Sequence, residues 1–194
     1  MGAAMSWPLA LMNGAMTKKR GLKELDIKSE KYVLPLLLAA ICGALFWRVG
    51  LGWRLLYLVL TLFCGAAVAV LDMKYRVIPN ELVLALMALK LVFGAAGAVE
   101  LNVWSSLGGL AVCFVLFLLP LVFKKNVGAG DVKLAAAMGF CLGLRGSLVA
   151  VAIMGALVLI YAVLQTKTPL LSMMKEFVPM GPFIVVAMII VQAI

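Results

Sequence analysis

Long apolar blocks, separated by short charged or glycine-containing segments, dominate the chain from residue 32 onward. A helix needs roughly 17 to 25 apolar residues to cross a bilayer, and most of the blocks are of that length. We count seven, with expected bounds Tyr32–Val49, Leu55–Leu71, Leu82–Val99, Leu107–Phe123, Val132–Leu144, Leu148–Leu164 and Phe177–Ile194. The fifth is short and is separated from the sixth by Arg145 and Gly146. The pattern predicts an all-α, polytopic transmembrane helical bundle of about six to seven spans.

Composition supports this class. The 194 residues are 66% hydrophobic and only 13% charged, whereas soluble domains carry about 25% charged residues. We expect two parts: a basic tail over residues 1–31, and a single transmembrane domain over residues 32–194.

The distribution of Lys and Arg predicts the orientation of the bundle. If the amino end is cytoplasmic and seven spans follow, 13 of the 17 basic residues lie in cytoplasmic segments, three lie on the other side, and Lys90 falls inside the third block. This asymmetry is typical of membrane proteins. We therefore expect a multi-pass protein of the cytoplasmic (inner) membrane with its amino end inside. The net charge of +9 then indicates contact with membrane lipid, and no nucleic-acid partner is expected.

The residue types exclude several chemistries. The chain has no histidine, which removes Ser/His and Cys/His nucleophile pairs and the commonest metal ligand. Its four cysteines all lie inside apolar blocks without a CxxC motif. We read them as small buried hydrophobic residues, and we expect no disulfide, no metal site and no cofactor.

Two acids abut the ends of apolar blocks on the same predicted side of the membrane. Asp72 ends the second block in "AVLDMKYRVIPNEL", and Asp131 opens the fifth in "GAGDVKL". An ionisable group at membrane depth is costly and marks a functional site by default. Each also has a structural interpretation: Asp131 as a helix cap after a glycine turn, and Asp72 as one half of an interfacial ion pair with Lys74 or Arg76.

Two carboxyl groups that share a site resist ionising together, so one keeps a proton while the other is charged. Such a pair can hydrolyse an amide: the ionised member takes a proton from water, and the protonated member donates to the carbonyl oxygen. Gly128 and Gly130 would let backbone approach the site closely. Pro79 with Asn80 would fix the short loop after Asp72.

Together these residues resemble the type IV prepilin peptidases and their archaeal preflagellin relatives, which are GxGD intramembrane aspartyl proteases. Three segments carry the resemblance, which covers roughly Leu55 to the carboxyl end: "LDMKYRVIPN", "GAGDVKL" and "VPMGPFI". The resemblance implies that Asp72 and Asp131 form the catalytic pair. It also implies an active-site loop and a set of structural residues near the site. The loop residues are Gly128, Gly130 and Lys133, and the structural residues are Arg76, Pro79, Asn80, Pro179, Gly181 and Pro182.

The resemblance further implies prepilin or prepilin-like substrates, each with a short basic leader ahead of an apolar helix, cut at the cytoplasmic face. Larger bacterial members carry paired CxxC zinc ligands in an amino-terminal cytoplasmic region and also methylate the new amino terminus. Residues 1–31 contain no cysteine. We therefore expect a minimal form with peptidase activity and no methyltransferase activity.

Two other functions remain open from the sequence. The acids could serve a small ion- or proton-coupled carrier, or the chain could be a non-catalytic pilus-assembly protein. A carrier usually places its acids near the midplane and often has internal repeats, and neither is evident here. Lys90 raises a serine–lysine protease as a further possibility, but no serine is suitably placed, and we expect Lys90 to snorkel or to pair with an acid.

Overall fold

The computed structural model describes residues 30–122, 128–164 and 180–194, which form six α-helices and no β-strand. The helices are α2 Glu30–Val49, α3 Trp53–Tyr75, α4 Asn80–Ala95, α5 Val103–Val122, α6 Ala129–Leu164 and α8 Gly181–Ala193. The predicted all-α class is confirmed. Most of the predicted basic tail lies outside the described residues.

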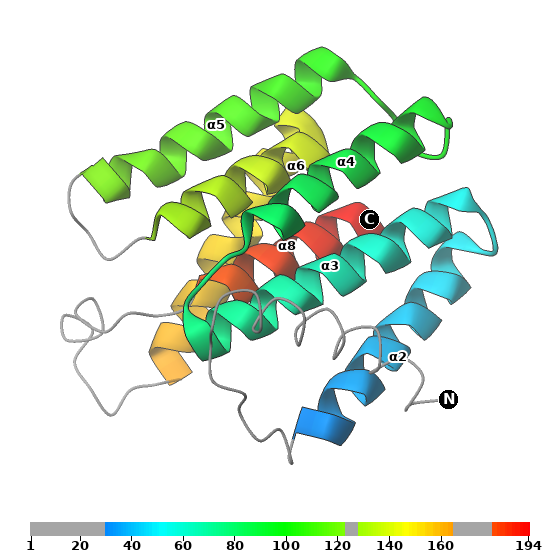
Figure 1. The fold of residues 1–194 in the computed structure, drawn as a ribbon, viewed down its shortest axis with the longest axis horizontal. Coiled ribbons are helices and arrows are strands. Elements are labelled where there is room, and N and C mark those ends of the chain that lie inside the picture. Colours follow the sequence, from blue (N-terminus) through cyan, green and yellow to red (C-terminus); the bar gives the residue numbers. More distant parts are fainter. Residues whose placement is uncertain (1–29, 123–127, 165–179) are drawn as a thin grey trace.

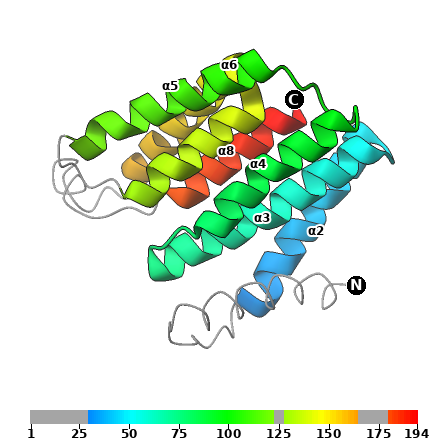
Figure 2. The ribbon, with the colours of Figure 1, turned by 45° about the horizontal axis from the view of Figure 1, so that its top comes forward.

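A single glycine divides α6 into two segments. Gly143 has φ 71° and ψ 179°, which is not helical, and Figures 1 and 2 show α6 turning back on itself. Thirty-six residues in one straight helix would extend about 54 Å. With this break, the described helices form seven segments that correspond to the seven apolar blocks.

Several boundaries differ from the sequence expectation; α3, for example, ends four residues late, at Tyr75. The break in α6 falls at Gly143, before the expected Arg145, because glycine tolerates positive φ and the freed Leu144 N–H donates to Ser105 Oγ at 3.0 Å. Helix α4 ends four residues early, at Ala95, where Gly97 adopts a φ of 73° and closes the helix. Helix α5 begins four residues early, at Val103. There the Asn102 side chain caps the helix by accepting a hydrogen bond from the Ser105 N–H at 3.1 Å.

Among the described residues, three helices are long and apolar enough to cross a membrane: Trp53–Tyr75, Val103–Pro120 and Ala129–Tyr161. Large apolar side chains are also exposed on the outside of the bundle, including Leu116, Leu119 and Ile160. These features are those of a membrane protein. The number of spans and the side on which the amino end lies stay predictions.

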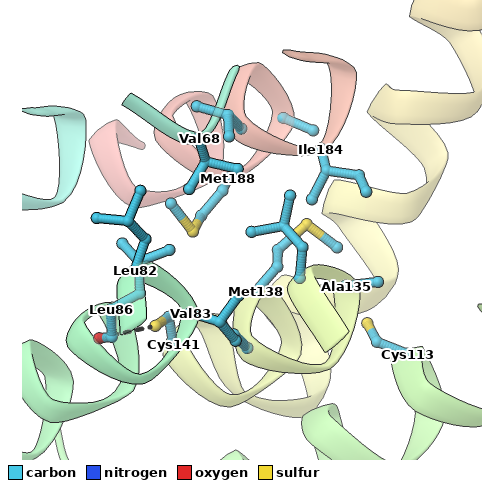
Figure 3. Close-up of a cluster of buried hydrophobic side chains, with 14 of the residues drawn as sticks. Val68, Leu82, Val83, Leu86, Cys113, Ala135, Met138, Cys141, Ile184 and Met188 are labelled. Atoms are coloured by element: carbon cyan, nitrogen blue, oxygen red, sulfur yellow. Dashed lines mark hydrogen bonds between the residues drawn. The ribbon is translucent and has the colours of Figure 1, made fainter. Parts of the chain in front are cut away.

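Helix α8 is central in the bundle. It packs against both α3 and α6, while α4 contacts α3 and α6, and α2 rests on α3. Figure 1 shows α8 lying between α6 and α3, with α2 inclined to the others. The larger core cluster joins α3, α4, α5, α6 and α8. In Figure 3 its side chains interlock, and the Cys141 Sγ donates to the Leu86 carbonyl at 3.5 Å.

Glycines let two helix pairs approach closely. A methyl group added at Gly109 of α5 would overlap the carbonyl oxygen of Gly139 in α6, and one added at Gly139 would overlap that of Gly109. Between α3 and α8, a methyl group at Gly65 would lie 2.7 Å from Val185 Cγ1. Small residues at such contacts are how membrane helices pack without a hydrophobic driving force between them.

Candidate active site

Asp72 lies in the last turn of α3 and is only 5% exposed. Its Oδ2 accepts a hydrogen bond of 2.8 Å from the backbone N–H of Gly181, the first residue of α8. The helix ends one turn later at Arg76, whose backbone is left-handed with φ 52° and whose N–H donates to the Asp72 carbonyl at 2.9 Å. Arg76 also interacts electrostatically with the Asp72 carboxyl group. Asp72 therefore faces an electropositive helix start and a nearby cation.

Asp131 lies in the first turn of α6 and is 6% exposed. Its Oδ2 accepts a hydrogen bond of 3.0 Å from the Gly128 N–H, and its own N–H donates to the Gly128 carbonyl at 3.0 Å. This reciprocal pair closes the turn that begins the helix. The Asp131 side chain therefore helps to cap the start of α6, which is the structural role considered from the sequence. This geometry is also compatible with a catalytic role.

The fold brings the two aspartates together. The carboxyl groups of Asp72 and Asp131 are close enough to interact electrostatically, although 59 positions separate them in the chain. One comes from the end of α3 and the other from the start of α6, and the start of α8 completes the group. Figure 1 places these three helix ends at one end of the bundle. Two neighbouring buried carboxyl groups resist ionising together, and this costly arrangement marks this end as the candidate site.

Three glycines lie at the most crowded positions of the site, where a side chain would have little room. A methyl group at Gly181 would lie 2.7 Å from Asp72 Oδ2 and 3.0 Å from its Cγ. At Gly130 it would lie 3.1 Å from Ile78 Cβ, and at Gly128 it would lie 3.3 Å from Asp131 Oδ2. A side chain at any of the three positions would push against the carboxyl groups or the loop beside them.

The remaining predicted site residues tie the loop after α3 to α6. Pro79 is fully buried and precedes the first residue of α4, Asn80. The Lys133 ammonium donates to Asn80 Oδ1 at 3.2 Å, which joins the starts of α4 and α6. Pro182 occupies the first turn of α8, where its missing N–H costs nothing. Pro179 lies outside the described residues.

A family model described as the type IV leader peptidase family matches residues 58–163, which is more than half of the 194 residues. The chain belongs to the type IV leader peptidase family. The matched range contains both aspartates and both glycines of the GxGD segment.

Several curated proteins named "Prepilin leader peptidase/N-methyltransferase" are similar to this leader peptidase family member. The one from Xanthomonas campestris pv. campestris is 30% identical over 169 residues, covering 80% of this chain and 55% of that protein. The one from Stutzerimonas stutzeri is 28% identical over 172 residues, covering 82% of this chain and 57% of that protein. This chain thus spans about half the length of these relatives. No solved structure matches it. The expectation that it lacks methyltransferase activity stays a prediction.

Sequence reasoning missed two contributions in this leader peptidase family member. Gly181 was expected to be structural, but its N–H is the hydrogen-bond donor to Asp72, 109 positions away. The sequence signal for this donor is the Gly-Pro pair, which commonly opens a helix and leaves N–H groups free there. Ile78 was not singled out, yet it packs on Gly130 and sets how closely the loop approaches α6. Nothing in the sequence pattern alone identifies that contact.

Proposed function

We propose that this chain is an aspartyl endopeptidase of the cytoplasmic membrane that removes the short basic leader of prepilin-like proteins. The observation that carries the proposal is the juxtaposition of Asp72 and Asp131, both buried and both at one end of the bundle. The family match supports it, and so do the names of the relatives. A water molecule held between the two carboxyl groups is the nucleophile.

The surroundings of the two carboxyl groups support different roles. Asp72 has the Gly181 N–H at the start of α8 and the Arg76 cation, and both favour a negative charge. Asp131 also lies at a helix start and accepts from the Gly128 N–H, but the charge that acts on it is the neighbouring Asp72, which disfavours a second negative charge. We therefore assign Asp72 as the ionised general base and Asp131 as the protonated general acid.

In the first step Asp72 takes a proton from the water, and the water oxygen bonds to the scissile carbonyl carbon. Asp131 gives its proton to the carbonyl oxygen, which produces a neutral tetrahedral intermediate. In the second step the bond from carbon to nitrogen breaks, the leaving amine takes the proton held by Asp72, and Asp131 recovers a proton from the hydroxyl group of the intermediate. The pair thus returns to its starting protonation without a covalent intermediate.

The position of the pair fits a peptide bond at a membrane boundary. Asp72 lies in the last turn of α3 and Asp131 in the first turn of α6, so both are near a helix end. We propose seven spans with the amino end inside, which places this end at the cytoplasmic face. A leader that precedes an apolar helix would present its junction there, and no helix would need unwinding deep in lipid.

The test is co-expression with candidate prepilins from the same genome, followed by gel mobility and by mass spectrometry of the new amino terminus. We expect the wild type to remove the leader, and Asp72→Asn and Asp131→Asn to abolish removal while remaining in the membrane fraction. Asp26→Asn is the matched control because Asp26 is the only other aspartate of the chain. It should cleave like the wild type.

Leader removal by both single variants at a rate close to that of the wild type would contradict the dyad. No cleavage by the wild type across several prepilins would favour the carrier or the non-catalytic assembly protein. Cation-dependent uptake in proteoliposomes would then separate those two, because only the carrier moves an ion.

A further inference from the structure

A second polar site lies at the end of the bundle opposite to the aspartates. A cavity of about 660 Å³ opens between the loop after α4, the start of α5 and the break in α6. Within the first segment of α6, Asp131 and Gly143 are separated by about 18 Å of helix. The cavity is therefore separate from the dyad, and its volume falls in the range of small-molecule sites, about 300–1,000 Å³.

A buried lysine lines this cavity. Lys90 is only 8% exposed, and its ammonium donates to the backbone carbonyl of Glu100 at 2.6 Å. It also interacts electrostatically with the Glu100 side chain, in agreement with the expected pairing with an acid. An ammonium group has three N–H donors, and this is its one hydrogen bond to any residue that the structure describes. Lys90 thus retains donor capacity at the cavity.

The rest of the lining combines a second cation, one acid and apolar side chains. Arg145 is exposed at the cavity and forms no hydrogen bond or ion pair with the described part of the chain. Glu100 supplies one carboxylate on the same cavity. Trp104, which is 85% exposed, and Leu144 add an apolar rim. An indole at the edge of a membrane bundle is typical of the interface with lipid headgroups.

We propose that this cavity binds the headgroup of an aminophospholipid, with its phosphate between Lys90 and Arg145 and its ammonium at Glu100. Two cations and one carboxylate complement one phosphodiester and one primary amine. Guanidinium and ammonium groups are the usual partners of phosphate oxygens. The apolar rim at Trp104 and Leu144 contacts the first part of the lipid tails. A free anion has no tails and would leave this rim exposed.

The test uses the purified full chain in detergent, titrated with phosphatidylethanolamine or with phosphatidylglycerol, with bound lipid counted by native mass spectrometry. Phosphatidylglycerol has the phosphodiester but no amine. We expect phosphatidylethanolamine to bind more tightly, and Arg145→Gln to weaken it by about tenfold through the loss of a charge-assisted hydrogen bond. Glu100→Gln should reduce the preference for the amine-bearing lipid.

Arg54→Gln is the matched control, since Arg54 is an exposed arginine at the start of α3, at the same end of the bundle, and does not line the cavity. Equal effects of Arg145→Gln and Arg54→Gln would overturn the site. Equal binding of the two lipids by the wild type would overturn the assignment of the amine to Glu100. Release of bound lipid by inorganic phosphate alone would show a free-anion site in place of a lipid site.

Discussion

The two ends of the bundle bury charge in different ways. At one end, the carboxyl groups of Asp72 and Asp131 each accept a hydrogen bond from a glycine N–H at or just before a helix start. At the other end, Lys90 donates to a backbone carbonyl in the loop after α4 and faces an open cavity. The first end is crowded where glycine backbone approaches the carboxyl groups, whereas the second end has a cavity among its side chains.

This difference follows from what the backbone offers at each place. Helix starts carry unpaired N–H groups that favour anions, whereas the carbonyl groups of a loop favour cations. The crowded end holds its acids in fixed positions, which suits a reaction that requires precise placement of protons. The open end holds its cations around a space, which suits binding. The following variants test this contrast, beginning with the largest expected effect.

The double variant Asp72→Asn/Asp131→Asn measures whether the two carboxyl groups act as one unit. Each single variant should lower the cleavage rate by about 10²–10⁴-fold, the usual contribution of a general acid or base. The double variant should lose little more than either single one, because groups that act together are strongly non-additive. Single-turnover leader removal with purified variants is the measurement. Losses that multiply would mean that the acids act independently, and the crowded end would then be two separate sites.

Gly181→Ala tests the crowding around Asp72 directly. The added methyl group would lie 2.7 Å from Asp72 Oδ2, so the start of α8 and its N–H must shift away from the carboxylate. We expect a loss of about 10- to 100-fold in the cleavage rate, because misplacement of about 1 Å costs on that order. The matched control is Gly155→Ala in α6, where an added methyl group meets nothing within 4 Å. Equal activity of the two variants would show that the contact is unimportant for the reaction.

Gly130→Ala should have a smaller effect of the same kind. Its methyl group would lie 3.1 Å from Ile78 Cβ, which is tight but involves the loop and leaves the carboxyl groups untouched. We expect a few-fold loss in cleavage rate, since a displacement of a few tenths of an ångström suffices to relieve it. Comparison of its rate with that of Gly181→Ala is the readout. A larger loss of cleavage rate in Gly130→Ala than in Gly181→Ala would mean that the contact at the start of α6 matters more than the contact between Gly181 and Asp72.

The hydrogen bond between Lys133 and Asn80 should contribute least. Both groups lie at the surface, and a hydrogen bond there contributes about 0.5–1.5 kcal/mol. Lys133→Met and Asn80→Ala should each lower the unfolding free energy by a fraction of that amount, and the double variant should show a favourable coupling between them. Denaturation in mild detergent, followed by circular dichroism, is the measurement. Strictly additive losses would mean that the 3.2 Å contact does not hold the two helix starts together.

The apolar blocks predicted where most helices lie, because length and composition alone determine what can cross a bilayer. They misplaced the ends that local polar contacts decide. Asn102 caps α5, which begins four residues before the expected apolar block, and Gly97 closes α4 inside an apolar stretch. The signals for these two ends were present in the residue types, but counting apolar positions does not use them.

The candidate site was predictable in its residues more than in its contacts. Position and residue type singled out Asp72 and Asp131, and the family resemblance paired them. The hydrogen bond from Gly181 to Asp72 spans 109 positions, and no local pattern encodes such a distance. The same holds for the cavity, where Arg145 and Glu100 line one space only because the chain reverses at Gly143.

The mutual contact of Gly109 and Gly139 has a mechanical consequence. This close contact couples any movement of α5 to the first segment of α6, which carries Asp131. Asp72 lies on α3, and α8 packs against both α3 and α6. The distance between the two acids of the proposed dyad therefore depends on how α8 holds α3 against α6.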